Sequence, residues 1–337
     1  DQRAHRSELR SPYAVAPDVV MTAMEVVAAC ALDAAVGDPR IMPHPVRWMG
    51  SLSAYVHRRV RTLGMGPRSL RAAGMFLPLG LPAAAFAAAW LLIAAGMAVH
   101  DWIGQGVGIC LASTTLAWRD LVDHVRGVSG ALKSGSLERA RNAVGLIVGR
   151  DTQDLSEEEV VRAAVETTAE SACDGVIAPL LFLVVGGPPL ALAYKAVSTL
   201  DSMVGHRDEE YRDFGWASAR LDDLANWIPA RITAWLIAAA AGLVLLSANS
   251  AKRSGAILLR DGHKHPSPNS GRPEAAMAGA LGVRLGGINF YGGRRAERPV
   301  LGDAEAPLSV GQVDRAQRIM TAAYVMAIVA VAGVLSW

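Results

Sequence analysis

The chain has 337 residues, a formal net charge of +2 and a hydrophobic fraction of 52%. Its mean hydropathy of +0.26 is too high for an average soluble enzyme of this length, which excludes the ordinary soluble classes and indicates a membrane protein. Three cysteines without metal-ligand spacing, Cys30, Cys110 and Cys173, predict neither a disulfide framework nor a thiolate metal site.

Residues 1–17 are polar and of mixed charge, and they lack the short apolar core and cleavage site of a signal peptide. We expect them to be a disordered extension, and we expect residues 18–337 to form a single membrane-embedded domain. The first predicted span is Val19–Val36, in which Glu25 and Asp33 lie eight residues apart and share one helical face. Ionisable groups inside a span usually face protein or a polar cavity.

Further apolar segments follow along the chain. Gly74–Val99 has 26 residues without a formal charge, enough to cross a hydrocarbon core of about 30 Å. Ile232–Ala248 and Ala316–Trp337 are two more strong candidates, whereas Trp102–Trp118 and Val176–Val197 are weaker ones. We therefore predict an all-α polytopic integral membrane protein with five or six transmembrane helices and polar, partly helical cytoplasmic loops.

The polar segments between these spans differ in charge. Gly37–Arg71 carries seven arginines and one acid, and Lys252–Arg315 carries ten Lys or Arg against six acids, so the positive-inside rule places both in the cytoplasm. Asp201–Pro229, with three arginines and seven acids, has two open placements. It lies outside if Val176–Val197 spans fully. It lies inside, or at membrane depth, if the Gly-Gly-Pro-Pro break at 186–189 makes that helix re-entrant.

A first motif, LDAAVGDPRIMPHPVRWMG at 32–50, ends the first predicted span. Its Gly-Asp-Pro break and Pro-His-Pro triplet favour a stiff, extended backbone that holds Asp38, His44 and Arg47 at the membrane surface. The alternative is a helix-ending turn in which Arg47 and Trp48 form an ordinary interfacial anchor.

The next motif begins with VGRDTQD at 148–154, where Arg150 and Asp151 form either an ion pair that caps a turn or an anion contact. Ser156 and Glu159 then form a capping box that starts a helix, and Gly175 is the predicted stop.

Charged side chains follow at intervals of four along this helix, and they are Glu158, Arg162, Glu166, Glu170 and Asp174. Like charges at this spacing repel by roughly 0.2–0.5 kcal/mol per pair, so three successive acids suggest a compensating Arg, Mg²⁺ or substrate ammonium. A solvated helix face is the simpler interpretation, and the spacing alone favours it.

A third segment, 195–231, interleaves charged residues with aromatic ones. Guanidinium forks suit phosphate, and paired acids suit Mg²⁺ that also binds substrate phosphates. The candidates for a phosphate, a metal and an amide-rich ligand here are Asp201, Arg207, Tyr211, Arg212, Asp222, Asp223 and Asn226.

The fourth segment, Asp261–Gly293, is polar and dense in glycine and proline. His263 and His265 lie two apart in a proline-rich loop, unlike the i, i+4 pair of a helical zinc site, so zinc is not favoured. Glu274–Gly287 begins like a helix and then offers three glycines, where a ligand or another helix can approach closely. Neither a Walker A motif nor a dinucleotide fingerprint is present.

Together these segments resemble the CobD/CbiB family of adenosylcobinamide-phosphate synthases, membrane proteins of cobalamin biosynthesis. The resemblance covers the chain from about residue 24 to its end, with the motifs in the family's order. The matching stretches are LDAAVGDPRIMPHPVRWMG, VGRDTQDLSEEEVVRAAVETTAESACDGVIAPL, YKAVSTLDSMVGHRDEEYRDFGWASARLDDLANWIPAR and DGHKHPSPNSGRPEAAMAGALGVRLGGINFYGG.

The resemblance implies an ATP-dependent amide ligase. It would join a propionate carboxylate of adenosylcobyric acid to (R)-1-amino-2-propanol phosphate, or to free aminopropanol, with ATP and Mg²⁺ as co-substrate and metal. It further implies a multi-pass protein of the cell membrane, with the corrinoid as substrate and the lipid bilayer as surroundings. A second copy or other late membrane enzymes of the pathway are further expected partners, and nucleic acid is not.

Residue roles follow from the resemblance as hypotheses. Metal and ammonium contacts are assigned to Glu166, Glu170, Asp174, Asp222 and Asp223, with Glu170 also catalytic. The candidate bases are His44, His263 and His265. Substrate contacts are assigned to Asp38, Arg47, Arg150, Asp151, Arg207, Tyr211, Arg212, Asn226, Lys264, Asn269, Glu274, Arg284, Asn289 and Tyr291.

A non-enzymatic membrane protein is the rival class, either a corrinoid transporter or a sensor of the AmpE kind. Transporters usually place broken helices and ionisable residues near mid-membrane in two matching halves. No internal repeat is visible in this sequence, and most polar residues fall outside the predicted spans.

Overall fold

The computed structural model describes residues 19–37, 45–205 and 211–337. The predicted extension at 1–17, Asp38, His44 and Arg207 lie outside the described residues. The elements are α2 (Ala23–Val36), α3 (Pro45–Arg61), α4 (Pro67–Gly74), α5 (Phe76–Val99), α6 (Asp101–Ser113), α7 (Trp118–Lys133), α8 (Leu137–Val144), α9 (Glu157–Ser171), the π-helix η1 (Ala172–Ile177), α10 (Ala178–Val204), α11 (Trp216–Ala225), α12 (Trp227–Val244), α13 (Ala248–Asp261), α14 (Gly271–Leu281), β1 (Leu285–Tyr291), β2 (Arg294–Leu301) and α15 (Val310–Leu335).

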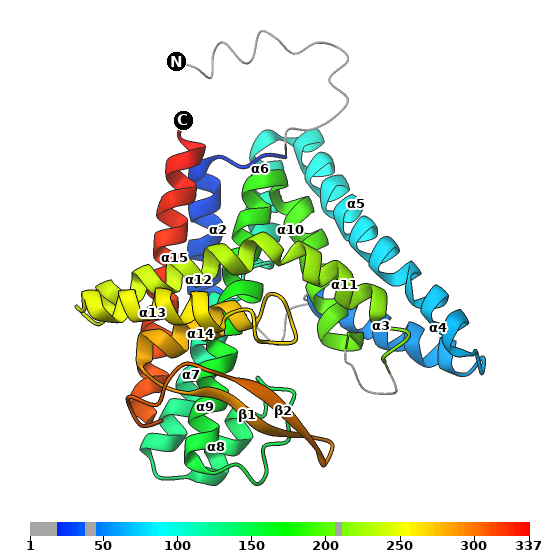
Figure 1. The fold of residues 1–337 in the computed structure, drawn as a ribbon. Coiled ribbons are helices and arrows are strands. Elements are labelled where there is room, and N and C mark those ends of the chain that lie inside the picture. The colour runs from blue at the N-terminus through cyan, green and yellow to red at the C-terminus, as the bar shows by residue number, and fades with distance from the viewer. Residues whose placement is uncertain (1–18, 38–44, 206–210) are drawn as a thin grey trace.

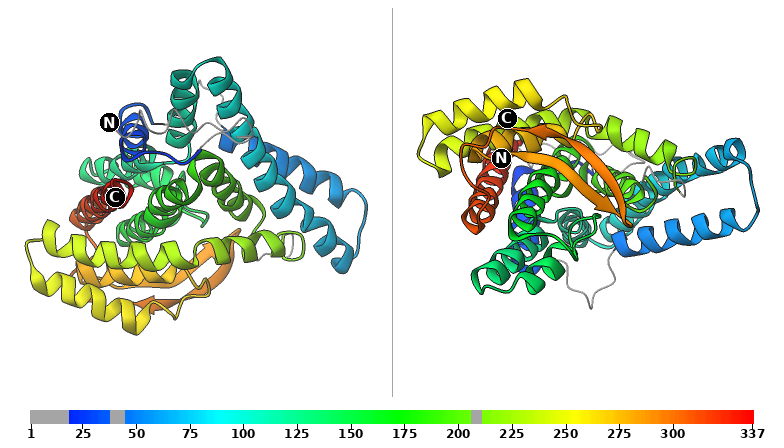
Figure 2. Two further views of the ribbon diagram at one scale, coloured as in Figure 1. Left: turned by 90° about the horizontal axis from the view of Figure 1, so that it is seen from above. Right: turned by 60° about the horizontal axis from the view of Figure 1, so that its bottom comes forward.

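The elements separate into an upper part and a lower part in the view of Figure 1. α2, α5, α6, α10 and α15 run along the length of the upper part, whereas α12 and α13 lie across them (Figures 1 and 2). α7, α8, the hairpin β1–β2 and the start of α9 form the lower part. The C-terminus lies at the upper end, opposite the hairpin.

Four helical segments are long and apolar enough to cross a membrane: Pro67–Val99, Glu157–Val204, Trp227–Val244 and Val310–Leu335. The prediction of a largely helical polytopic membrane protein is therefore confirmed, but the predicted count of five or six spans is wrong for the described residues. The segments that fail are α2 and α6, which have only 14 and 13 residues. A helix needs about 20 residues to cross the hydrocarbon core.

The two acids of the first predicted span explain why α2 is short. Glu25 forms a capping box with Thr22 and so fixes the start of the helix. Asp33 is buried, and its carboxylate accepts a hydrogen bond from the backbone N–H of Trp118 at 3.2 Å, near the start of α7. Both acids thus position neighbouring backbone.

The capping box of Ser156 and Glu159 is present as predicted. The predicted stop at Gly175 is wrong, because the chain continues through η1 into α10 and remains helical. The N–H of Ala117 donates to the Gly175 carbonyl at 2.9 Å, so a neighbouring loop satisfies an acceptor in the irregular π turn. The row of charged residues at intervals of four, from Glu158 to Asp174, is also not a solvated helix face. α9 is buried on all sides from Val160 to Ala169.

α10 reverses direction within its length. Gly186 and Gly187 depart from helical geometry, with φ, ψ of −149°, 24° and 63°, −166°. Tyr194 Oη donates to the carbonyl oxygen of Asp174 at 3.3 Å, although the two residues are 20 apart in sequence. They would be about 30 Å apart in an uninterrupted helix. The Gly-Gly-Pro-Pro break therefore makes a re-entrant helical hairpin, with its tip at the upper end in Figure 1.

The hairpin β1–β2 departs from the all-helical prediction. The strands pair antiparallel, with Tyr291 opposite Arg294 and a Gly292-Gly293 turn in which both φ values are positive. Such a turn needs two residues that tolerate the left-handed region, which is why Gly-Gly serves here. The hairpin extends below α14 and reaches α9, so it forms one wall of the hollows described next.

Candidate functional site

Two adjoining hollows lie where α9, η1, α11, the loop 262–270 and the hairpin meet. The narrower hollow has a volume of about 220 Å³ and the wider one about 600 Å³. The side chains common to both linings are Glu170, His265, Tyr291 and Arg298. Because they share these residues, we treat the two hollows as one candidate site.

One wall of the wider hollow is acidic. Its carboxylates come from α9, η1, the returning half of α10 and α11, and they are Glu170, Asp174, Asp201, Asp222 and Asp223. The reversal of α10 is what brings Asp201 and α11 back to the level of Asp174. The site thus unites two segments that a fully spanning helix would have placed on opposite sides of the membrane.

Asn226 links this acidic wall to the helices behind it. Its side-chain nitrogen donates to both carboxylate oxygens of Asp222, each at 3.1 Å. Its side-chain oxygen accepts a hydrogen bond from Tyr194 Oη at 2.8 Å. Asn226 is only 1% exposed, so this network fixes the position of Asp222.

Burial changes the titration of two acids at the site. Burial, then the nearby Asp174 and Asp201, raise the pKa of Asp222 well above its ordinary value. Burial, then the nearby Glu166 and Glu170, raise the pKa of Glu274 in the same direction. Both carboxyls therefore hold a proton more strongly than an exposed acid does.

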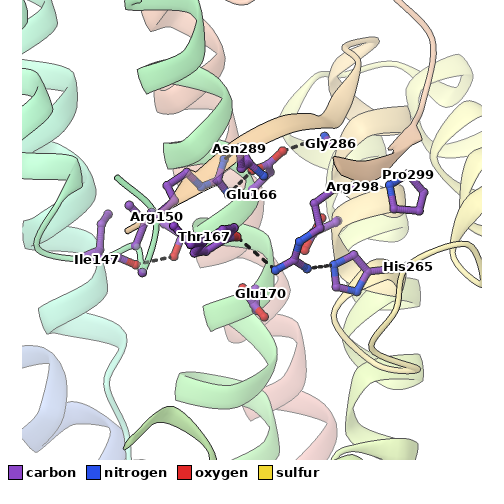
Figure 3. Close-up of a pocket in the computed structure, with 14 residues that line it drawn as sticks. Ile147, Arg150, Glu166, Thr167, Glu170, His265, Gly286, Asn289, Arg298 and Pro299 are labelled. Carbon is purple, nitrogen blue, oxygen red and sulfur yellow. Dashed lines mark hydrogen bonds and ion pairs between the residues drawn. The ribbon is translucent and has the colours of Figure 1, made fainter. Parts of the chain in front are cut away.

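In the narrower hollow, Arg150 is the central side chain of one wall (Figure 3). Its guanidinium donates to Glu166 at 2.5 Å and to the Asn289 side-chain oxygen at 2.9 Å. Glu166 accepts a second hydrogen bond from the N–H of Gly286 at 2.7 Å. Burial alone lowers the pKa of Arg150, but the Glu166 carboxylate and other nearby acids outweigh it and raise that pKa.

Arg162, one turn before Glu166 on α9, lies behind this wall and lines a separate hollow on the other side of β1. It is buried and donates to the carbonyl oxygens of Gly286 and Ile288 and to the Asn289 side-chain oxygen. Arg162 therefore attaches β1 to α9, whereas the cation that compensates Glu166 is Arg150 from the preceding loop. Glu166 has both oxygens engaged, which favours a positioning role for it over metal ligation.

Asp151 positions the turn of the hairpin. Its carboxylate accepts hydrogen bonds from the N–H groups of Gly292 and Gly293 at 2.9 and 2.7 Å, and its own N–H donates to Phe290 at 2.8 Å. Arg150 and Asp151 thus act on separate partners.

His265 faces two donors at the junction of the hollows. Its Nδ1 accepts from the Ser267 N–H at 3.0 Å, and its Nε2 contacts the guanidinium of Arg298. Arg298 also donates to Tyr291 Oη at 3.1 Å. Figure 3 shows Arg298 and His265 across the hollow from Arg150 and Glu166, with Glu170 below and between the two pairs.

Glu170 makes no hydrogen bond or ion pair with any side chain that the structure describes. Asn269 is also incompletely satisfied: its amide nitrogen donates to the carbonyl of Asp223 at 2.8 Å, while its buried side-chain oxygen has no partner. Both line the wider hollow, where a ligand would meet them.

Some predicted site residues lie elsewhere. Tyr211 stacks on His57 with ring centroids 4.5 Å apart, and it belongs to an apolar cluster beside α5. Lys264 binds Asp261 at 2.6 Å, and His263 is exposed outside both hollows. The other predicted residues that do not line the site are Asp151, which holds the hairpin turn, Arg47 and Arg212, which are exposed, and Arg284, which lines the separate hollow on the far side of β1.

The acids do not form a ready-made metal cluster. Among residues 19–37, 45–205 and 211–337, no group of three His, Cys, Asp or Glu side chains stands close enough to hold a metal ion. The carboxylates of the wider hollow are oxygen donors of the kind Mg²⁺ prefers. This ion is commonly held by one or two carboxylates together with substrate phosphates and water.

The cations of β2 were missed by the sequence reasoning. Arg294, Arg295 and Arg298 line the wider hollow from β2, together with Glu297. The predicted segment ended at Gly293. A Gly-Gly pair between two short runs is a hairpin signal, and it would have drawn attention to the strand that follows.

Comparisons with known proteins agree on one family. A family model described as CobD/Cbib protein matches residues 26–320. The cobalamin biosynthesis protein CbiB of Salmonella typhimurium is 44% identical over 308 residues, covering 91% of this chain and 96% of that protein. The cobalamin biosynthesis protein CobD of Citrobacter koseri is 46% identical over 308 residues, with the same coverage.

A CobD protein of Geobacter metallireducens is 51% identical over 283 residues, which cover 84% of this chain and 87% of that protein. No solved structure matches the chain.

Proposed function

The chain belongs to the CobD/CbiB family, and we propose on this basis that it acts in cobalamin biosynthesis as an ATP-dependent amide ligase. The proposed reaction joins a propionate carboxylate of adenosylcobyric acid to the amine of (R)-1-amino-2-propanol phosphate, or of free aminopropanol. The observation that carries the proposal is the pairing, in one continuous hollow, of an acidic wall with an arginine-bearing hairpin.

The proposed reaction needs both the cationic side chains of the hairpin and the acidic wall. A carboxylate is a poor acylating agent, so its oxygen first attacks the terminal phosphorus of ATP, ADP leaves, and an acyl phosphate forms. The amine nitrogen then attacks the acyl carbon, inorganic phosphate leaves, and the nitrogen loses a proton. Cations must surround the phosphates, and acids must bind the ammonium and take its proton.

We assign the phosphate contacts to Arg294, Arg295 and Arg298 of β2. Asp222 is the proposed base, because its raised pKa makes its carboxylate a stronger base than that of an exposed acid. Glu170, which binds no described side chain, is the proposed contact for the ammonium itself. Asn269 offers its unpartnered oxygen to an amide N–H of the corrinoid.

Mg²⁺ fits the donor types of this hollow. Asp174 and Asp223 would hold it together with the substrate phosphates, where it would neutralise negative charge.

We also propose that the site faces the cytoplasm of a cell-membrane protein. The support is the excess of arginine and lysine in Gly37–Arg71 and Lys252–Arg315.

The test uses the purified chain in lipid nanodiscs with adenosylcobyric acid, aminopropanol phosphate, Mg²⁺ and ATP. We expect one ADP for each amide formed, measured by mass spectrometry. Glu170→Gln and Asp222→Asn should each lower kcat by about 100-fold or more. The matched control is Glu138→Gln on α8, an exposed acid outside both hollows, which should turn over normally.

Three results would contradict parts of this proposal. Amide formation without ATP would contradict the acyl-phosphate step. Full activity of both acid variants would contradict the roles proposed for Glu170 and Asp222. Uptake of the corrinoid into sealed vesicles without any amide would support the transporter instead.

A further inference from the structure

The helices α3 and α4 carry a surface that the proposed reaction does not use. Residues 45–74 contain six arginines and no aspartate or glutamate. α4 continues into α5 after a single residue, Met75, and α5 belongs to a segment that can span a membrane. The chain itself therefore holds this cationic surface at the end of a membrane-spanning helix (Figure 1).

α3 presents three different faces. One face packs on the returning half of α10, where Gly50 lies beside Met203 and where Ser53 and His57 are buried. A second face, at i, i+4 and i+7, exposes Trp48, Leu52 and Tyr55. Apolar side chains in a row on a surface helix are typical of a helix that lies in the membrane interface.

The third face of α3 is cationic. Arg58 is exposed and makes no hydrogen bond or ion pair with any described side chain, and the same holds for Arg68 at the start of α4. Arg59 lies over the Tyr55 ring at 5.4 Å, and its Nε donates to Tyr55 Oη at 3.2 Å. Arg58 lies roughly 80° around the helix from Trp48, at about 100° per residue. Arg58 therefore flanks the apolar row, whereas Arg59, four residues after Tyr55, continues that row at its C-terminal end.

We propose that α3 and α4 form a binding surface for the headgroups of anionic phospholipids. The apolar row enters the acyl boundary, and Arg58, Arg59 and Arg68 meet the phosphates at its edge. Complementary charge favours this occupant, because Arg58, Arg59 and Arg68 lie in a segment that contains no acid, whereas Arg71 of this segment forms an ion pair with Asp213 from outside it. Continuity with α5 places the surface at that layer.

The test compares lipids directly. The chain is reconstituted with spin-labelled phosphatidylglycerol or phosphatidylcholine, and electron paramagnetic resonance gives the relative association of each lipid. Wild type should prefer phosphatidylglycerol, and the preference should fall at high salt. Arg58→Gln/Arg68→Gln should reduce it by as much as fivefold per arginine, about the weight of one cation at an anionic membrane surface.

The matched control is Arg126→Gln/Arg139→Gln, which removes two exposed arginines from α7 and α8. It should keep the wild-type preference. An equal loss in this control would show a net-charge effect and overturn the proposal, as would a wild type without preference. Displacement of the labelled lipid by inorganic phosphate alone would assign the arginines to a soluble anion instead. Thermal unfolding in phosphatidylcholine shows that each variant is folded.

Discussion

Arg150 holds the narrower hollow together, because it joins the loop before α9 to Glu166 and to Asn289 of the hairpin. The side chains of Arg150 and Glu166 are only 11% and 5% exposed. Removing one partner of a buried ion pair leaves the other charge uncompensated, at a cost of about 3–5 kcal/mol. Arg150→Met should therefore lower the free energy of unfolding by about this amount, measured by SDS titration in mixed micelles.

Two variants check the origin of that loss. Arg139→Met changes an exposed arginine on α8 and should leave the free energy of unfolding nearly unchanged. Arg150→Met/Glu166→Gln removes the stranded charge and should recover part of the stability. If the single Arg150 variant were as stable as wild type, the pair would not hold the wall.

The raised pKa values of Asp222 and Glu274 predict how stability depends on pH. The folded chain binds more protons at these groups than the unfolded chain, whose values are ordinary, 3.8 and 4.5. Stability is therefore fully present below those values and is lost as pH rises through the folded pKa values. The Tm of the metal-free chain should therefore fall as the pH rises above these ordinary values.

Asp222→Asn should make that fall in Tm smaller, and Mg²⁺ should offset it most at the higher pH. Asp261 has the opposite sign: its hydrogen bonds with Arg260 lower its pKa, so its contribution is lost only at strongly acidic pH. A measurement above about pH 5 leaves Asp261 ionised. Equal slopes for wild type and Asp222→Asn would contradict the prediction.

At the scale of elements, the reversal of α10 depends on Gly187. Its φ of 63° and ψ of −166° lie in a region that only glycine occupies readily. A Cβ there would also stand 2.0 Å from the carbonyl oxygen of Val19. Gly187→Ala should therefore lose at least about 1–3 kcal/mol and should lower amide formation as the acidic wall comes apart.

Gly80→Ala is the matched control, because Gly80 lies inside α5 and a Cβ there would meet nothing within 4 Å. It should be neutral or slightly stabilising, since alanine favours a helix over glycine by about 1 kcal/mol. A Gly187 variant as stable and as active as this control would show that the reversal does not need glycine.

A second prediction at this scale concerns the turn of the hairpin β1–β2. Asp151→Asn keeps the shape of the side chain but replaces one of the two carboxylate oxygens that accept hydrogen bonds from the N–H groups of the turn. Amide hydrogen exchange at Gly292 and Gly293 should become at least severalfold faster, whereas exchange in α9 should not change. Unchanged exchange at the turn would mean that the Gly-Gly geometry alone holds it.

The sequence predicted those elements whose signals are local. The capping box of Ser156 and the long apolar runs are patterns of adjacent residues, and the structure has them. It left the break at 186–189 open between two topologies, because glycine and proline show where a helix bends and not where it goes next. The hairpin was missed because neither strand alternates regularly between buried and exposed side chains, the pattern by which a strand is recognised in a sequence.

The candidate site was likewise predicted only in part from the sequence. Glu170, Asp222 and Asn269 share a hollow, as their residue types and the family resemblance suggested. Lys264 and Tyr211 have equally suitable side chains, but Asp261 and His57 engage them away from the site. Such partners lie far apart in sequence, or depend on the direction of a loop, and no spacing rule contains them.

At the scale of the whole molecule, the arrangement predicts which side each end faces. The C-terminus lies at the upper end in Figure 1, just after α15, whereas Asp303 precedes the other end of this candidate membrane span in the sequence. With the native cysteines replaced, Ser336→Cys and Asp303→Cys should react with a membrane-impermeant maleimide from opposite faces of sealed vesicles. Labelling of both from one face would contradict this topology.

The re-entrant hairpin of α9 and α10 also determines from which side of the membrane a ligand enters and leaves the site. A chain that turns back at Gly186–Pro189 has both of its charged ends on one side, so whatever binds between them arrives from that compartment and departs into it. For the proposed ligase, neither substrate nor product would then have to cross the membrane. Turnover should then be indifferent to a voltage or an ion gradient imposed on the vesicle.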